Sequence, residues 1–198
     1  MPPGNKRERR ITALLVKKIP SLLTSGNMLL GLTVLYLNIG KKDGDYLVLS
    51  CILILIAAVL DAFDGVTARL LGAESDFGKE FDSFADLISF GLAPMGVLLT
   101  VEAIAARPAI LILLALYPVA GVFRLVRFNL GNSSGYFTGL PITAAGFIQA
   151  CFILLVNGVD FPAQWVARSA ALLTAVLSLL MVSAFRVRRP RLWQKERP

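Results

Sequence analysis

The sequence predicts an all-α, polytopic membrane protein with six transmembrane helices. Of its 198 residues, 56% are hydrophobic and the mean hydropathy is +0.71, which is far too apolar for an ordinary soluble domain. The apolar residues fall in long runs, and a helix needs roughly 20 of them to cross a bilayer core of about 30 Å. We expect a single membrane domain over residues 1–198, without a separate soluble domain. The predicted spans are about Ser21–Ile39, Tyr46–Asp61, Asp86–Ala105, Ala109–Val126, Pro141–Val156 and Val166–Phe185.

Both ends of the chain are basic. The segment RERRITALLVKK, within residues 1–20, has the composition of a short amphipathic helix that lies on the membrane surface. A solvated basic arm is the alternative. No cleavage-site pattern follows this segment, so we do not expect a cleaved signal peptide. Residues 186–198 are predicted to form a basic cytoplasmic tail.

The distribution of Lys and Arg predicts the orientation in the membrane. Six spans place both termini on one side, and sixteen of the 20 Lys and Arg residues then lie on that side. Because cytoplasmic segments are enriched in these residues, we expect both termini in the cytoplasm and the protein in the cytoplasmic (plasma) membrane. The net charge of +7 would then face anionic lipid headgroups. Nucleic acid is not an expected partner, because the basic residues frame the spans instead of forming a separate basic domain.

The sequence contains no histidine. This absence excludes Ser-His-Asp and Cys-His catalysis, zinc bound by histidine, and a phosphohistidine intermediate. The two cysteines, Cys51 and Cys151, lie in apolar runs and are expected to be small core residues. The chemistry that remains is based on carboxylates and metal ions.

Four aspartates lie around the connection between the second and third predicted spans. Asp61 and Asp64 are three residues apart, and Asp82 and Asp86 are four apart, so each pair shares a face if its segment is helical. Converging carboxylates repel one another, and a divalent cation relieves that repulsion. Ligands that are all oxygen favour Mg²⁺ or Mn²⁺. Carboxylates solvated at the headgroup level are the alternative, which this spacing disfavours. The full pattern, D-x2-D-G-x2-A-R-x8-G-x3-D-x3-D, adds Gly65, Ala68, Arg69 and Gly78.

This pattern resembles the signature of the CDP-alcohol phosphotransferase family of membrane enzymes and agrees with it at all eight fixed positions. The resemblance implies a homodimeric, two-metal enzyme that moves a substituted phosphoryl group from a CDP-linked lipid to an alcohol and releases CMP. It implies that Asp61, Asp64 and Asp82 are metal ligands. By the same resemblance, Asp86 ligates the second metal ion and accepts the proton of the alcohol.

Three residues inside the motif are candidates for contacts with the CDP group. Gly65 and Ala68 would let a nucleotide approach the backbone closely, although small residues also serve helix packing in membranes. Arg69 can bind a phosphate or an aspartate, and the resemblance places it near CDP.

Further candidates for nucleotide binding lie outside the fixed positions. Ser75 and Asp76 are in the loop between the two acidic pairs, where they could contact the nucleotide or cap the loop. Thr24 and Asn27 are polar residues early in the first span. They could contact the cytidine or bond to neighbouring helices.

Three other stretches indicate the acceptor alcohol. IPSLLTSGNMLLG, DSFADLISFGLAP and FRLVRFN…FTGLPITAAG resemble the CDP-diacylglycerol–serine O-phosphatidyltransferase branch of the family, over about residues 20–146. This resemblance implies CDP-diacylglycerol and L-serine as substrates. Glycerol 3-phosphate and inositol phosphate remain alternative acceptors. The candidate residues for binding the acceptor are Arg124, Arg127, Asn129 and Ser89.

Each of these four candidates has a second interpretation. Arg124 and Arg127 share a helix face and could hold the serine carboxylate or a phosphate, or they could anchor the span by the positive-inside rule. Asn129 could complete a polar pocket, and Ser89 could face the acceptor or bond to its own helix. A divalent-cation transporter is the alternative function from a different class. The clustering of the carboxylates at one membrane face argues against it.

Overall fold

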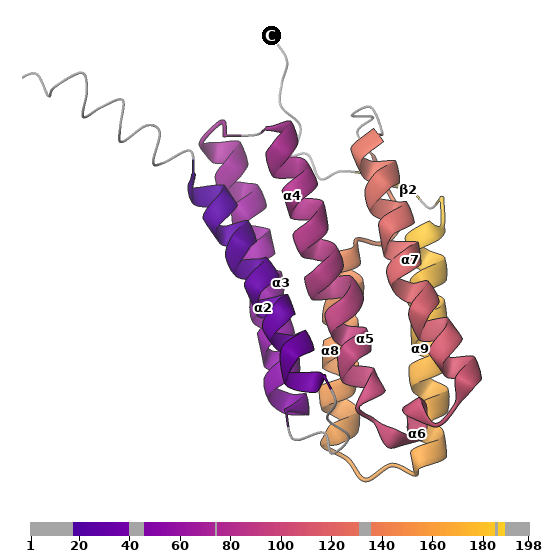
Figure 1. The fold of residues 1–198 in the computed structure, drawn as a ribbon. Coiled ribbons are helices and arrows are strands. Elements are labelled where there is room, and N and C mark those ends of the chain that lie inside the picture. Colours follow the sequence, from indigo (N-terminus) through magenta and orange to yellow (C-terminus); the bar gives the residue numbers. More distant parts are fainter. Residues whose placement is uncertain (1–17, 40–45, 74, 131–135, 185, 189–198) are drawn as a thin grey trace, which may run out of the picture.

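The computed structural model describes residues 18–39, 46–73, 75–130, 136–184 and 186–188. Within these residues, helices run back and forth between the two ends of an elongated bundle (Figure 1). The predicted all-helical membrane fold is therefore confirmed. The helices are α2 (Ile19–Asn38), α3 (Leu47–Leu70), α4 (Asp76–Asp86), η1 (Leu87–Leu92), α5 (Ala93–Leu99), α6 (Glu102–Ala105), α7 (Pro108–Leu130), α8 (Ile142–Asn157) and α9 (Ala163–Val182).

Five helical segments of the described chain are long and apolar enough to cross a membrane. They are α2, α3, the continuous α4–η1–α5 segment, α7 and α9. The remaining long apolar helix, α8, has 16 residues, which corresponds to about 24 Å and falls short of a typical bilayer core. The fifth predicted segment is thus a helix, but the predicted count of six spanning helices is not confirmed.

The second and third helical segments have different boundaries from the predicted ones. α3 continues past Asp61 to Leu70, and the next helix already begins at Asp76, before Asp86. The hydropathy pattern weakens where the aspartates begin, but the helices continue because Asp64 and Asp86 are buried against other helices rather than exposed to lipid. The third segment ends at Leu99, short of the predicted end, and α6 is a separate short helix.

Polar pairs join neighbouring helices inside the bundle. The Nδ2 of Asn38 on α2 donates to the Oγ of Ser50 on α3 at 2.7 Å. The Nε2 of Gln149 on α8 donates to the Oγ1 of Thr174 on α9 at 3.1 Å. All four side chains are buried. Hydrogen bonds of this kind hold helices together in membranes, where lipid offers no competing partner.

A short antiparallel pair of strands lies at the end of the bundle where α7 and α9 finish (Figure 1). β1 (Tyr136–Thr138) pairs with β2 (Arg186–Arg188), with Phe137 opposite Val187. This pairing joins the connection between α7 and α8 to the chain that follows α9. The sequence did not predict these strands. The rest of the predicted tail, and all but the last three residues of the predicted basic arm with its surface helix, lie outside the described residues.

Candidate active site

Three aspartates from two helices form a compact group within the bundle. Asp61 and Asp64 lie one turn apart on α3, and Asp82 lies on α4. Each can offer one carboxylate oxygen, and these three oxygens lie within 4.8 Å of one another. Oxygens from three carboxylates at this spacing suit a hard divalent cation. The helices thus bring together three of the four aspartates of the motif in one group.

Asp86 lies beside this group but is not one of its three members. It is only 6% exposed and interacts electrostatically with Asp61, Asp82 and Arg124. The Oδ1 atoms of Asp82 and Asp86 are buried without a hydrogen-bond partner among the described residues. Buried acceptor atoms without a partner destabilise a protein, so these carboxylate oxygens are suited to binding one or more cations.

Two threonines, one on α2 and one on α8, orient the aspartates of α3. The Oγ1 of Thr24 on α2 donates to Oδ2 of Asp64 at 2.9 Å. The Oγ1 of Thr143 on α8 donates to Oδ2 of Asp61 at 3.0 Å. Of the two interpretations that the sequence offered for Thr24, the structure shows the bond to a neighbouring helix, whereas Thr143 was not among the candidate residues. The only signal for Thr143 was its place in the stretch FTGLPITAAG, which was used to infer the acceptor.

Arg124 on α7 supplies positive charge to the aspartates. Its side chain is 8% exposed and interacts electrostatically with Asp86, Asp61 and Asp82. Its guanidinium also lies over the ring of Phe128, 5.3 Å from the centroid. The Nε atom is buried and has no hydrogen-bond partner among the described residues. An arginine in this position can bind an anion next to the carboxylates.

Arg127 and Asn129 make contacts away from the aspartates. The guanidinium of Arg127 donates to the carbonyl oxygens of Val182 and Ser183, at 3.0 and 2.9 Å, at the end of α9. Asn129 donates to Oγ of Ser83 at 3.0 Å and to a carboxylate oxygen of Glu80 at 3.3 Å, both on α4. Arg127 thus closes the end of α9, and it still lies near enough to Arg124 for their positive charges to repel. A pocket shared by the two arginines stays a prediction.

Ser75 and Ser89 have structural partners. Ser75 is the N-cap of α4, and its side chain accepts a 3.0 Å hydrogen bond from the backbone N–H of Gly78. Ser89 is fully buried and donates to the backbone carbonyl of Asn27 on α2 at 2.8 Å. Ser89 thus bonds to a neighbouring helix, which is neither of the two roles that its sequence position suggested. The side-chain amide of Asn27 is buried without a hydrogen-bond partner among the described residues.

Gly65 leaves space beside the guanidinium of Arg69. A Cβ atom at Gly65 would lie 3.7 Å from Nη1 and 3.9 Å from Nη2 of Arg69. Arg69 is exposed and interacts electrostatically with Asp64. Ala68 is half-buried, and its carbonyl accepts a hydrogen bond from the N–H of Ala73 in the turn after α3. The arginine therefore lies where the edge of the aspartate group meets solvent.

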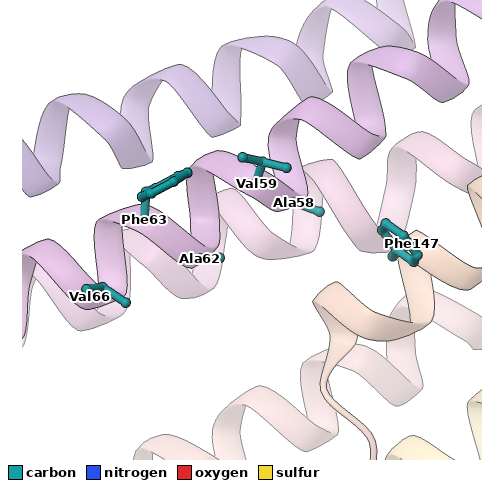
Figure 2. A pocket seen from close by; sticks show the side chains of 6 residues that line it. All are labelled: Ala58, Val59, Ala62, Phe63, Val66 and Phe147. Atoms are coloured by element: carbon teal, nitrogen blue, oxygen red, sulfur yellow. The ribbon is translucent and has the colours of Figure 1, made fainter.

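An apolar groove of about 370 Å³ runs along α3. Figure 2 shows its lining: Ala58, Val59, Ala62, Phe63 and Val66 lie along α3, and Phe147 of α8 lies across from them. Ala62 and Phe63 stand between Asp61 and Asp64 in the sequence. The polar centre and the apolar groove thus share one helix.

The fold and the site together define a polytopic membrane protein with a group of carboxylates suited to binding divalent cations. The chain belongs to the CDP-alcohol phosphatidyltransferase family, whose sequence profile matches residues 17–185. The resemblance of the acidic motif to this family is thereby confirmed.

Several characterised proteins are similar to this chain. A CDP-diacylglycerol–serine O-phosphatidyltransferase of Bacillus subtilis (strain 168) is 41% identical over 143 residues, which cover 69% of this chain and 74% of the relative. An enzyme of the same name from Helicobacter pylori (strain ATCC 700392 / 26695) is 32% identical over 170 residues, which cover 84% of this chain and 70% of the relative. An archaetidylserine synthase of Methanothermobacter thermautotrophicus is 34% identical over 180 residues, covering 89% and 71%.

Proposed function

We propose that this protein transfers the phosphatidyl group of CDP-diacylglycerol to L-serine, giving phosphatidylserine and CMP. The observation that carries the proposal is the group of Asp61, Asp64 and Asp82, with carboxylate oxygens within 4.8 Å, in a member of the CDP-alcohol phosphatidyltransferase family. Serine as the acceptor is supported by the similarity to relatives whose names state that reaction.

The aspartates fit the divalent cations that this chemistry requires. Asp61, Asp64 and Asp82 would hold one ion, and the unpaired oxygens of Asp82 and Asp86 offer ligands for a second. We propose Mg²⁺ or Mn²⁺, because all of these ligands are carboxylate oxygens. Such ions, when bound, stabilise negative charge on the transferred phosphoryl group and on the departing CMP.

The residues of the chain then have distinct roles in the transfer. The serine hydroxyl oxygen forms a bond to the β-phosphorus while the bond from that phosphorus to the oxygen of CMP breaks. Asp86 accepts the hydroxyl proton, since its buried Oδ1 has no competing donor among the described residues. Direct attack by the hydroxyl of serine, without a covalent enzyme intermediate, is part of the proposal, because the sequence has no histidine and we identify no better nucleophile at the site.

The donor substrate can be placed by its two chemically different parts. Gly65 and Ala68 leave the backbone of α3 open to the nucleotide, and Arg69 can bind its diphosphate. The acyl chains suit the groove along α3, which is lined by apolar side chains on the helix that also carries Asp61 and Asp64. Thr24 contributes by holding Asp64. We retain the unpaired amide of Asn27 as a candidate contact for the cytidine.

The acceptor site includes Arg124, whose unpaired Nε and position beside the aspartates suit the serine carboxylate. Serine is favoured over glycerol 3-phosphate and inositol phosphate by the names of the similar proteins. The hydrogen bonds of Arg127 to α9 hold its guanidinium in place but leave its positive charge near Arg124. Membership of a transferase family argues against the cation-transporter alternative.

We further propose an orientation in the membrane and an oligomeric state. Lys18, Arg69, Lys79, Arg124 and Arg127 lie toward the same end of the bundle, which supports an active site facing the cytoplasm from the plasma membrane. We also propose a single membrane domain, which the apolar runs of the sequence support, and a homodimer, which the family resemblance implies. Light scattering of the detergent-solubilised protein tests the dimer, and labelling of single cysteines from either side of the membrane tests the orientation.

The direct test is CMP release by the purified protein from CDP-diacylglycerol. Serine, glycerol 3-phosphate and inositol phosphate are supplied one at a time with Mg²⁺ or Mn²⁺, and EDTA serves as the control. We expect metal-dependent release with serine alone. Release with another acceptor instead would keep the transferase chemistry and overturn the choice of serine. Folded protein that releases no CMP with any acceptor would overturn the proposal.

A further inference from the structure

One π-helical turn among the described residues directly follows Asp86. This turn, η1, spans Leu87–Leu92 and joins α4 to α5 without interrupting the helix. Such turns are rare inside α-helices and are frequent at functional sites. Resting on the function proposed above, we infer that η1 is a clamp that fixes Asp86, with Ser89 and Tyr117 as positioning residues that hold it.

Two hydrogen bonds attach consecutive residues of η1 to different helices. The Oγ of Ser89 donates to the carbonyl of Asn27 on α2 at 2.8 Å. The Oη of Tyr117 on α7 donates to the carbonyl of Phe90 at 3.2 Å. Ser89, Phe90 and Tyr117 are all 0% exposed. Because these groups are fully buried, losing either bond would remove a partner from a buried polar group.

Two glycines bring neighbouring helices directly onto the backbone of η1. A Cβ atom at Gly31 on α2 would lie 2.5 Å from Oγ and 2.7 Å from Cα of Ser89. A Cβ atom at Gly146 on α8 would lie 2.7 Å from Cβ and 2.9 Å from Cα of Phe90. Backbone atoms cannot move aside cheaply, so only glycine permits this packing. The turn is thus held by three helices, α2, α7 and α8.

The clamp acts on Asp86 through the backbone. Asp86 is the residue immediately before η1, and its Oδ1 has no hydrogen-bond partner among the described residues. Its carboxylate also meets that of Asp61, so its place depends both on Asp61 and on where η1 holds the chain. Tyr117 and Arg124 are seven residues apart and share a face of α7, so one face of this helix meets both η1 and the aspartates. A displacement of about 1 Å at a catalytic group can cost roughly 100-fold in rate.

Tyr117→Phe tests the clamp because it removes only the hydroxyl that holds η1. Tyr36→Phe is the matched control, since Tyr36 is 79% exposed on α2. We expect Tyr117→Phe to lower kcat about 10- to 100-fold and to weaken Mn²⁺ binding, while the KM for CDP-diacylglycerol stays near that of the wild type. In an Asp86→Asn background the same change should have no further effect on the residual CMP release.

A second pair of variants tests the packing on η1. Gly31→Ala should lower kcat in the same way, because its Cβ would press on the backbone of Ser89. Gly26→Ala on the same helix should not, because its Cβ would meet only a side-chain carbon of Leu60 at 3.5 Å. The clamp is overturned if Tyr117→Phe and Gly31→Ala lower the melting temperature but leave kcat unchanged. If the wild type releases no CMP, the proposed function fails. In that case Mn²⁺ affinity tests the clamp. If Tyr117→Phe and the wild type bind Mn²⁺ with equal affinity, the clamp is overturned.

Discussion

Thr143 and Asp61 are 82 positions apart in the chain, yet the threonine hydroxyl donates a 3.0 Å hydrogen bond to Oδ2 of the aspartate. Thr143 lies in the first turn of α8, and Asp61 lies on α3. Thr24 makes the equivalent contact with Asp64 from α2. Each aspartate of α3 thus has one oxygen fixed by a neighbouring helix, and each offers a carboxylate oxygen to the group that could hold a cation. Partners of this kind orient metal ligands and tune their affinity.

Replacing Thr143 with valine should weaken the metal site. Valine keeps the shape of the side chain but cannot donate to Asp61, so we expect Mn²⁺ affinity and kcat to fall about tenfold while the fold is retained. The measurement is titration calorimetry with Mn²⁺ and the rate of CMP release. Thr33→Val is the control, because Thr33 is exposed and its hydroxyl donates to the carbonyl of Leu29 on its own helix. Unchanged Mn²⁺ affinity in Thr143→Val would show that Asp61 does not need this bond.

The two arginines of α7 should differ in what they affect. Arg124→Gln removes the positive charge beside the aspartates, so we expect the KM for serine to rise at least tenfold. Arg127→Gln removes hydrogen bonds to the end of α9, so it should lower thermal stability and leave the KM for serine near that of the wild type. Steady-state kinetics and a melting curve for each variant separate the two effects. A rise in the KM for serine in Arg127→Gln would return Arg127 to the acceptor site.

A methyl group at Gly65 should interfere with the nucleotide rather than with folding. The added Cβ would be in ordinary contact with Arg69 at 3.7 Å, so the helix can accept it. We expect Gly65→Ala to raise the KM for CDP-diacylglycerol several-fold, because the methyl group fills space that the donor needs. Gly158→Ala is the matched control, with its nearest contacts at 3.6 and 3.7 Å at the other end of the bundle. Equal KM values in the two variants would remove Gly65 from the nucleotide site.

Much of the candidate site could be predicted because its central residues are close in sequence. Asp61 and Asp64 share a helix turn, and a single connection leads to Asp82 and Asp86, so local periodicity was enough to group them. The apolar runs likewise predicted the helical membrane fold. Their ends were misplaced because hydropathy weakens at the aspartates, whereas the helices continue to Leu70 and from Asp76.

The parts that could not be predicted depend on contacts between distant segments. Nothing near Thr143 in the sequence shows that α8 approaches Asp61, and nothing near Arg127 shows that the end of α9 lies within its reach. The local feature nearest the π turn is Pro94, which has no N–H to donate to the carbonyl of Phe90, but no prediction was made from it. The supports of the turn are Ser89, which bonds to α2, and Tyr117, which lies on α7.

The buried pair of Asn38 and Ser50 should contribute to stability without affecting catalysis. Their 2.7 Å hydrogen bond joins α2 to α3 at the end of the bundle away from the aspartates. Interhelical bonds in membranes contribute about 1 kcal/mol, so Asn38→Ala should lower the free energy of unfolding by about that amount. Unfolding by sodium dodecyl sulfate, measured for both single variants and for the double variant with Ser50→Ala, gives the coupling energy. Additive effects in this cycle would show that the bond contributes nothing.

Asp82 and Asp86 should differ in how many metal ions remain when each is replaced. Asp82 belongs to the group whose oxygens lie within 4.8 Å, whereas Asp86 lies beside it. We therefore expect Asp82→Asn to lose Mn²⁺ binding and CMP release together. Asp86→Asn should lose CMP release but keep one Mn²⁺ per chain, because Asp61, Asp64 and Asp82 are intact. Mn²⁺ titration monitored by electron paramagnetic resonance gives both stoichiometries.

The control for these two variants is Asp160→Asn, because Asp160 is exposed in the connection between α8 and α9, at the other end of the bundle. It should bind Mn²⁺ and release CMP like the wild type. If Asp86→Asn binds no Mn²⁺ although it is folded, Asp86 is a ligand of the first ion. The cluster of Asp61, Asp64 and Asp82 would then have to gain Asp86 as a fourth ligand when the metal binds. If Asp86→Asn instead keeps both ions and full CMP release, Asp86 is neither a ligand nor the base, and the proton of serine must leave by another route.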